Sequence, residues 1–160
     1  MLLAWIGIDP GASGALAVLD SEERLVETVR LRRADEPGGM ALLIADAIAQ
    51  TAEDYEIACV TIERVAAYPG QGVSSTFSFG RAYGEALGAA VCSRCHVETV
   101  PPQRWQRDLS LTSRKGTSKV EHKRHLRDTA SARFQTRLTL DECDAVWLAY
   151  WARRLGSRRA

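Results

Sequence analysis

The first twenty residues combine two apolar runs with a carboxylate at the point where the first run ends. WIGID ends at Asp9, the turn-forming residues PGASG follow, and GALAVLD at 14–20 is apolar again. Apolar runs bounded by turn residues predict buried strands, so this segment predicts two core strands joined by a tight hairpin. An ionised carboxylate is costly to bury without a partner. Asp9 therefore needs a partner for its charge at the end of the first strand.

The order of the remaining segments predicts an α/β fold. RLVETVRL at 24–31 adds a third strand and completes an antiparallel meander, and EIACVTIER at 56–64 is a buried strand that ends at Glu63. Periodicity and turn residues further predict a helix at 38–55, a loop at 65–80 that runs into a helix at 75–95, a strand at 96–102, a short helix at 101–111, and helices at 119–134 and 140–155. The 160 residues fit one domain, 1–160, with a five-stranded mixed sheet flanked by helices.

Charge is divided unevenly along the chain. Residues 1–100 carry 7 Lys/Arg and 14 Asp/Glu, whereas residues 101–160 carry 14 and 6, within a net charge of +1. A basic block of this kind is either a solvated face or a surface that binds a polyanion. The N-terminus lacks the basic start and apolar core of a signal peptide, and no apolar stretch reaches the roughly 20 residues of a membrane span. We therefore expect a cytoplasmic protein.

The four cysteines are expected to be reduced in that compartment. CSRCH, from Cys92 to His96, has the spacing of a haem-attachment motif, and Cys92 with Cys95 has that of half a zinc site. Covalent haem attachment needs export, and no second Cys/His pair has zinc-finger spacing. We expect neither haem nor zinc, and interpret the motif as a helix end that leads into a strand.

Three glycines recur every fourth residue in the helix predicted at 75–95. Gly80, Gly84 and Gly88 share one face of that helix. Each interior glycine costs about 1 kcal/mol relative to alanine, so the row predicts a compensating close contact. Its partner is either the sheet of the same chain or a second copy of the helix.

Four carboxylates have positions that suit metal-dependent chemistry. Asp9 and Glu63 each end an apolar strand, and Asp141 and Asp144 share a face at the start of the last predicted helix. Carboxylate oxygens are ligands for Mg²⁺ or Mn²⁺, and two such ions about 4 Å apart promote phosphodiester hydrolysis. Asp141 has the alternative role of stabilising the helix N-terminus.

These segments resemble the RuvC-type Holliday junction resolvases of the ribonuclease H-like superfamily over nearly the whole chain. IGIDPG with Asp9, VTIERV with Glu63, and DECDAVWLA with Asp141 and Asp144 are similar to the family's catalytic motifs. PGQGVSSTFSFGRAYGEALGAA looks like the phage and prophage members. The resemblance implies a ribonuclease H-like fold and a homodimer formed through the glycine helix. It also implies two Mg²⁺ ions per active site, replaceable by Mn²⁺, held by the four acids.

The resemblance also implies how DNA is bound and cut. GTSKVEHKRHL resembles the family's basic helix start, with Lys119 as the first candidate for the catalytic lysine and Lys123 as the second. Tyr68 or a nearby phenylalanine, Phe77 or Phe79, would probe the junction centre. The expected DNA-binding residues are Tyr68, Phe77, Arg81, Arg114, Lys115, Lys119, Lys123 and Arg124. The implied reaction is paired symmetric nicking of a four-way junction, which leaves 5′-phosphate and 3′-hydroxyl ends.

Other functions fit parts of the same pattern. A less selective branched-DNA or flap endonuclease, or a ribonuclease H, would need the same acids. A non-catalytic DNA-binding module gains nothing from an acidic crevice. GIDPGASGALAVLD also resembles the first phosphate-binding hairpin of sugar kinases and actin, but those proteins need a second domain of similar size.

Overall fold

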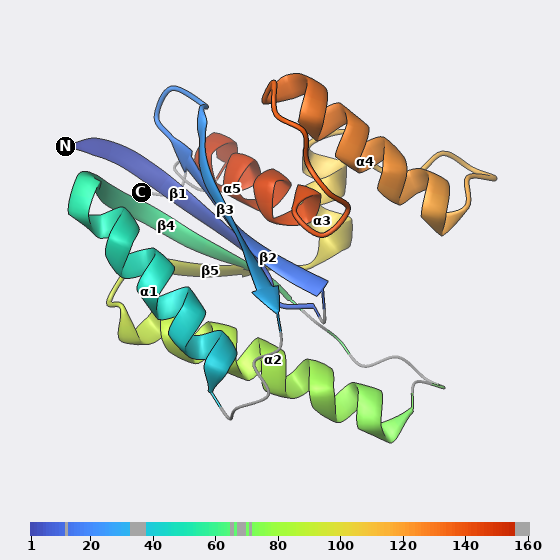
Figure 1. Cartoon of the computed structure of the whole chain (residues 1–160). Coiled ribbons are helices and arrows are strands. Elements are labelled where there is room, and N and C mark those ends of the chain that lie inside the picture. Colours follow the sequence, from blue (N-terminus) through green and yellow to red (C-terminus); the bar gives the residue numbers. More distant parts are fainter. Residues whose placement is uncertain (12, 33–37, 65, 67–69, 71, 156–160) are drawn as a thin grey trace.

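The computed structural model describes all residues except 12, 33–37, 65, 67–69, 71 and 156–160. It contains a five-stranded mixed sheet with helices on both faces (Figure 1). The strands are β1 Leu2–Asp9, β2 Ser13–Asp20, β3 Leu25–Arg32, β4 Tyr55–Glu63 and β5 Val97–Val100, in the spatial order β3-β2-β1-β4-β5. β1, β2 and β3 form the predicted antiparallel meander, whereas β4 runs parallel to β1 and β5 runs parallel to β4.

Two helical layers cover the sheet. Helices α1 (Gly39–Asp54) and α2 (Val73–Cys92) lie on one face, while α3 (Pro102–Asp108), α4 (Lys119–Arg133) and α5 (Cys143–Leu155) lie on the other. Side chains alternate along a strand, so Ile6 and Ile8 of β1 pack with α1 and α2, whereas Trp5 packs with α5. Because both faces are covered, the central strands are apolar along most of their length.

A glycine in the middle of β1 sets how closely α5 approaches the sheet. A Cβ atom added at Gly7 would lie 2.1 Å from the backbone oxygen of Ala145 and 2.4 Å from the backbone nitrogen of Ala149. The backbone of α5 therefore lies directly on β1, and a side chain at residue 7 would push it away. Asp144 is next to Ala145, so this contact carries Asp144 to the end of β1 where Asp9 lies.

Several predicted boundaries differ from the structure by a few residues, and two of them concern candidate functional residues. The last helix begins at Cys143 rather than at residue 140, and Asp141 lies in the turn before it, where Thr139 donates from its backbone N–H and hydroxyl to Glu142 (2.8 and 2.7 Å). The loop predicted over 65–80 is also too long, because α2 begins at Val73. The first turn of α2 is closed by a hydrogen bond from the Thr76 N–H to the Gly72 carbonyl (3.0 Å). The serines in this turn are therefore part of the helix.

The CSRCH segment lies at a helix end and leads into a strand, as predicted. α2 ends at Cys92 and β5 begins at Val97, and all four cysteines of the sequence are free thiols. In the described part of the chain, no helix has both the length and the apolar character that crossing a bilayer requires.

Candidate metal centre

Three of the four predicted acids converge at one edge of the sheet. Asp9 ends β1, Glu63 ends the neighbouring parallel strand β4, and Asp144 lies in the first turn of α5. One carboxylate oxygen from each lies within 4.8 Å of the other two. Asp9 and Glu63 are half-buried and Asp144 is only 8% exposed. The three side chains therefore offer a compact group of oxygen donors that water reaches poorly.

The glycine-rich turn after β1 orients the Asp9 carboxylate. The backbone N–H of Gly11 donates to Asp9 Oδ1 at 3.0 Å, and that of Gly14 donates to the Gly11 carbonyl at 3.0 Å. A Cβ atom at Gly14 would lie 2.1 Å from the Asp9 carbonyl oxygen, so only glycine fits there. The turn is the predicted hairpin, and it holds the carboxylate in place at the strand end.

Burial makes the ionised form of these acids costly. It raises the pKa of Asp9 to about 6, and the charge of Asp144 adds to that rise. Burial likewise raises the pKa of Glu63 to about 8, with a further contribution from Asp9. A group of carboxylates with raised pKa values is stabilised in its anionic form by any cation that binds among them. The chemistry of the site therefore favours a divalent metal.

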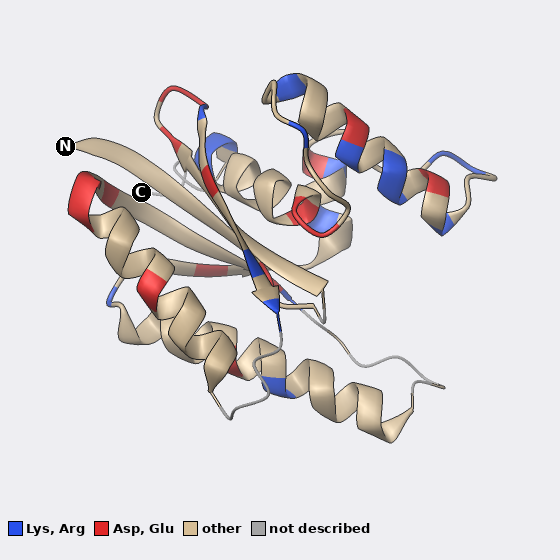
Figure 2. Cartoon of the chain, in the orientation of Figure 1, with Lys and Arg blue, Asp and Glu red and all other residues tan. Residues whose placement is uncertain are grey.

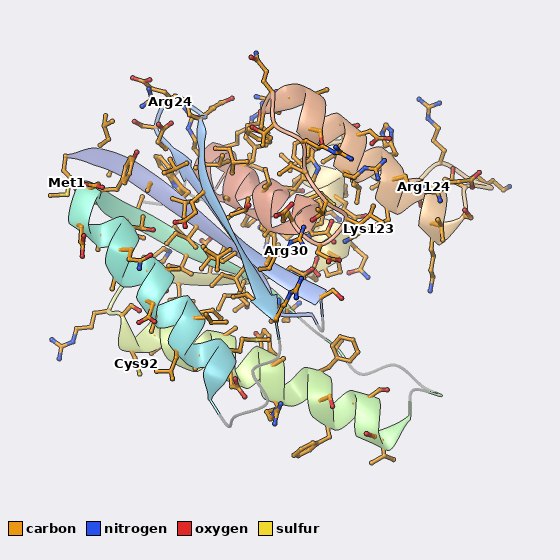
Figure 3. All side chains as sticks on the ribbon, viewed as in Figure 1. Met1, Arg24, Arg30, Cys92, Lys123 and Arg124 are labelled. Carbon is orange, nitrogen blue, oxygen red and sulfur yellow. The ribbon has the colours of Figure 1, made fainter. Side chains whose placement is uncertain are left out.

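One lysine already faces the carboxylates. Lys123 of α4 donates from Nζ to Asp144 Oδ2, and Figure 3 shows it between α4 and the start of α5. Burial acts to lower the pKa of Lys123, but the charge of Asp144, the hydrogen bond to it and the other nearby acidic groups together outweigh burial and raise the pKa. Lys119, the first lysine predicted, is exposed one turn earlier on the same helix.

The other predicted residues do not join this group. Asp141 lies outside the three-carboxylate cluster, although its charge contributes to the raised pKa of Asp9. Tyr68 lies outside the described residues. Phe77 is 74% exposed on α2, and Arg81 is exposed four residues further along, paired with Glu85 at 3.5 Å. Arg114 and Lys115 are exposed in the segment between α3 and α4, and Arg124 is exposed on α4 itself. Figure 2 shows several basic residues along this segment and α4.

The structure adds three residues that the sequence analysis did not single out. Trp105 is completely buried and donates from Nε1 to Glu63 Oε1 at 2.9 Å. Arg30 of the edge strand β3 lies 3.6 Å from Glu142, next to the start of α5. Gly7 permits the contact of α5 with β1. An isolated glycine in a strand is itself a sign of close backbone approach, so Gly7 had a signal in the sequence, whereas Trp105 and Arg30 had none.

The fold has known relatives among solved structures. No family model matches the chain, and no curated protein sequence is significantly similar to it. The structure of T. thermophilus RuvC in complex with a Holliday junction substrate is similar with a TM-score of 0.65 and 17% identity, covering 98% of each chain. A second T. thermophilus RuvC structure has a TM-score of 0.64 and 19% identity, covering 98% of this chain and 97% of that one.

The yeast mitochondrial Holliday junction resolvase Ydc2 is a more distant neighbour. Its TM-score is 0.51 at 13% identity, and the match covers 96% of this chain and 78% of that one. At such low sequence identities, the structural similarity shows the fold alone. The chain therefore has the ribonuclease H-like fold that these resolvases share, with its three carboxylates where strands β1 and β4 end beside α5.

Proposed function

We propose that this protein is a metal-dependent endonuclease that resolves four-way DNA junctions. The observation that carries the proposal is the grouping of Asp9, Glu63 and Asp144 within 4.8 Å, on a fold similar to that of Holliday junction resolvases. The C-terminal third of the chain, which supplies Asp144, carries 14 Lys/Arg and 6 Asp/Glu. In a protein that only bound DNA, such an acidic cluster would lower the affinity for DNA, because DNA is itself a polyanion.

The donor set fits Mg²⁺ or Mn²⁺. Both are hard cations that prefer carboxylate oxygens. The three acids supply such oxygens, and among the described residues Lys123 contacts one of them, Asp144. Asp9, Glu63 and Asp144 would hold two such ions, and Asp141 in the adjacent turn would ligate an ion or orient a water molecule. Divalent cations in such sites polarise the phosphodiester and lower the pKa of water.

The chain's own groups would support the reaction in two ways. Asp9, Glu63 and Asp144 would hold the cations that bind the reacting phosphate at the strand ends, and the lysines of α4 would offset the negative charge that develops on it. The oxygen of water bonds to phosphorus while the bond to the 3′ oxygen breaks. That oxygen takes a proton and leaves as a 3′-hydroxyl, and the 5′-phosphate stays on the other strand end.

DNA would be bound by the basic residues around the site. Arg114, Lys115, Lys119 and Arg124 are exposed on α4 and the segment before it, and Arg30 is 44% exposed on β3. Such side chains contact phosphates and position the duplex without reading its sequence. The exposed Phe77 on α2, or Tyr68, would probe the unpaired centre of the junction.

A homodimer would account for the glycine row on α2. Gly80, Gly84 and Gly88 are exposed, and a Cβ atom at any of them meets nothing within 4 Å. Packing on the chain's own sheet therefore does not require these glycines, and a second backbone would. A groove of about 630 Å³ between α1 and α2 lies beside Gly84 and Gly88. A two-fold dimer would place two sites symmetrically on a junction.

A cleavage assay with four substrates tests the proposal. A four-way junction, a Y-fork, an RNA:DNA hybrid and plain duplex are incubated with the protein in Mg²⁺, and both strands are mapped. We expect symmetric nicks in the junction alone. Equal cleavage of junction and duplex would contradict junction selectivity, and cleavage of the hybrid would favour a ribonuclease H.

The Asp9→Asn variant separates catalysis from binding. It is expected to bind the junction as the unmodified protein does and to lose cleavage by at least about 100-fold, because it removes one of the clustered carboxylates. Junction binding without cleavage by the unmodified protein in Mg²⁺ or Mn²⁺ would instead identify a non-catalytic module.

A further inference from the structure

We propose that Trp105 is a positioning residue that holds the Glu63 carboxylate beside those of Asp9 and Asp144, an inference that rests on the proposed metal-dependent activity. Trp105 belongs to α3, which carries none of the predicted acids. Its indole Nε1 lies 2.9 Å from Glu63 Oε1, and the residue is 0% exposed.

The contact is specific because of its chemistry. An indole offers one donor and no acceptor, and a buried tryptophan usually finds a partner for it. Here the partner is a carboxylate, so the bond is charge-assisted when Glu63 is ionised, and such bonds are stronger than neutral ones. The bond fixes one Glu63 oxygen, which restricts rotation of the carboxylate and keeps its other lone pairs available to a cation.

The helix that carries Trp105 is itself held from two sides. Trp151 of α5 donates from Nε1 to Asp108 Oδ2 at 3.0 Å, and His122 Nε2 lies 3.2 Å from Gln106 Oε1, which joins α3 to α4. Because α4 carries Lys123 and α5 carries Asp144, α3 is braced against the two helices that complete the site. The indole is thus held in place before any ligand arrives.

Such support from outside the ligand set has a known physical effect. A group that hydrogen-bonds a metal ligand orients that ligand, and its removal typically weakens metal affinity by 10- to 100-fold. Trp105 also packs in the core with Leu111 and Leu126, so its replacement tests two roles at once. The two roles differ in one readout, because loss of packing alone lowers stability without selectively weakening metal binding.

Trp151 of α5 offers a matched control, because its indole bonds a residue of α3, the helix that carries Trp105. It is 5% exposed and its indole also donates to an α3 carboxylate, that of Asp108, which lies outside the acidic cluster. Trp105→Phe and Trp151→Phe therefore each remove one buried indole N–H from a carboxylate. Only the first removes it from a proposed metal ligand.

The test is calorimetric titration of Mn²⁺ into each protein without DNA. We expect the Kd for Mn²⁺ to rise about 10-fold in Trp105→Phe. It should change less than about twofold in Trp151→Phe, which keeps both the Trp105–Glu63 bond and the contact of His122 with Gln106 that still holds α3. The rate of junction cleavage at subsaturating Mn²⁺ should fall in the first variant, while its Kd for the junction in Ca²⁺ stays unchanged. Unchanged Mn²⁺ affinity in Trp105→Phe, or an equal loss in both variants, would overturn the proposal.

A second variant covers the case in which Trp105→Phe does not fold. Replacement of Trp105 by 3-benzothienylalanine keeps the fused rings and puts sulfur in place of the N–H, so it removes the donor with little change of shape. The same loss of Mn²⁺ affinity is expected, and its absence would overturn the role of the N–H. Failure of the proposed metal-dependent activity has a different signature, because the unmodified protein would then bind no Mn²⁺.

Discussion

At the scale of single residues, the cost of burying charge dominates the site. Burial raises the pKa of Asp9 to about 6 and that of Glu63 to about 8, in each case with a contribution from a neighbouring carboxylate. Both groups favour their neutral form in the folded protein more than they do in the unfolded chain. Ionisation of these two carboxylates therefore lowers the free energy of unfolding. A cation bound among them would stabilise the ionised forms.

This imbalance predicts the pH dependence of stability in protein stripped of divalent cations with EDTA. Stability from these two groups is complete below their ordinary pKa values and is lost as the pH rises through about 6 for Asp9 and about 8 for Glu63. Lowering the pH from 8.5 to 5.5 should therefore raise Tm, on the order of 5 °C, as measured by calorimetry.

Two comparisons check the cause of that shift. Mg²⁺ or Mn²⁺ added at pH 8.5 should raise Tm, because a ligand that binds only the folded state stabilises it. The Asp9→Asn/Glu63→Gln double variant should lose the same pH dependence. A Tm that falls on acidification in the unmodified protein would show that these carboxylates are not the groups that matter.

The two lysines at the start of α4 provide a second residue-scale prediction. Lys123 contacts Asp144, whereas Lys119 is exposed. Lys123→Met should lower the single-turnover cleavage rate about 100-fold, as removal of a transition-state donor does, and Lys119→Met should lower it less than about 10-fold. Methionine keeps the apolar stem of each side chain. A larger loss in Lys119→Met would instead assign the catalytic role to Lys119, as the sequence resemblance implies.

The sequence predicted the acids at different levels of precision. Asp9 and Glu63 could be found because each follows a continuous apolar run, and neighbouring strand ends meet at one edge of the sheet. Asp144 shares the last helix with a long apolar face, which fixes it against β1. Asp141 was expected on the same helix face, but the helix begins at Cys143, two residues after Asp141. Such boundaries depend on local hydrogen bonds that a periodic pattern does not contain.

At the scale of elements, the contact between β1 and α5 places the acids relative to one another. It depends on Gly7, where a Cβ atom would lie 2.1 Å from the Ala145 carbonyl oxygen. The atoms that would clash belong to the helix backbone and not to a flexible side chain, so they cannot move independently. Any side chain at residue 7 must shift α5 as a unit, and with it Asp144.

Gly7→Ala is therefore expected to damage both stability and the site. Overpacking of this kind typically costs about 1–3 kcal/mol, and the backbone clash places Gly7→Ala near about 3 kcal/mol, measured by urea denaturation. Mn²⁺ affinity should fall as Asp144 is displaced. Gly72→Ala is the control, since a Cβ atom there meets nothing within 4 Å, the backbone of Gly72 is extended, and alanine in place of glycine at a helix N-cap should cost at most about 1 kcal/mol. Similar stability of the two variants would refute the close packing of α5.

Elements were easier to predict than the contacts between them. The meander, the helices and the β4 strand follow from local periodicity and turn residues, and the strand pairing confirms them. The bond from Trp105 to Glu63 joins residues 42 positions apart in sequence. No local pattern encodes which way a buried indole points, because that depends on how α3, α4 and α5 pack together.

At the scale of the whole molecule, the two sheet faces have different surroundings. The face covered by α3, α4 and α5 carries most of the basic C-terminal third (Figure 2), whereas the face covered by α1 and α2 presents an apolar groove beside Gly84 and Gly88. Leu42 of α1 is 66% exposed at that groove. The basic surface that would bind DNA phosphates and the groove proposed for self-association therefore lie on opposite faces, with Phe77 at the start of α2 as a proposed DNA contact on the groove side.

The glycine row leads to a prediction about assembly. The unmodified protein should be a dimer in light scattering after size exclusion, and Gly84→Leu should be a monomer, because leucine fills the space that a second α2 backbone would occupy. In the isolated chain that space is open, so the variant should still fold and keep its Mn²⁺ affinity. Its nicks in a four-way junction should lose their pairing, since each site would act alone.

Ser75→Leu is the matched control for that substitution. Ser75 is exposed on α2, about 180° around the helix from Gly84 at 100° per residue, so the same side chain is added to the same helix away from the predicted interface. It should remain a dimer with paired nicks. A dimeric Gly84→Leu would move the interface to another surface, and a monomeric unmodified protein that still makes paired nicks would mean that two copies meet only on the junction, where the two-fold symmetry of the DNA aligns them.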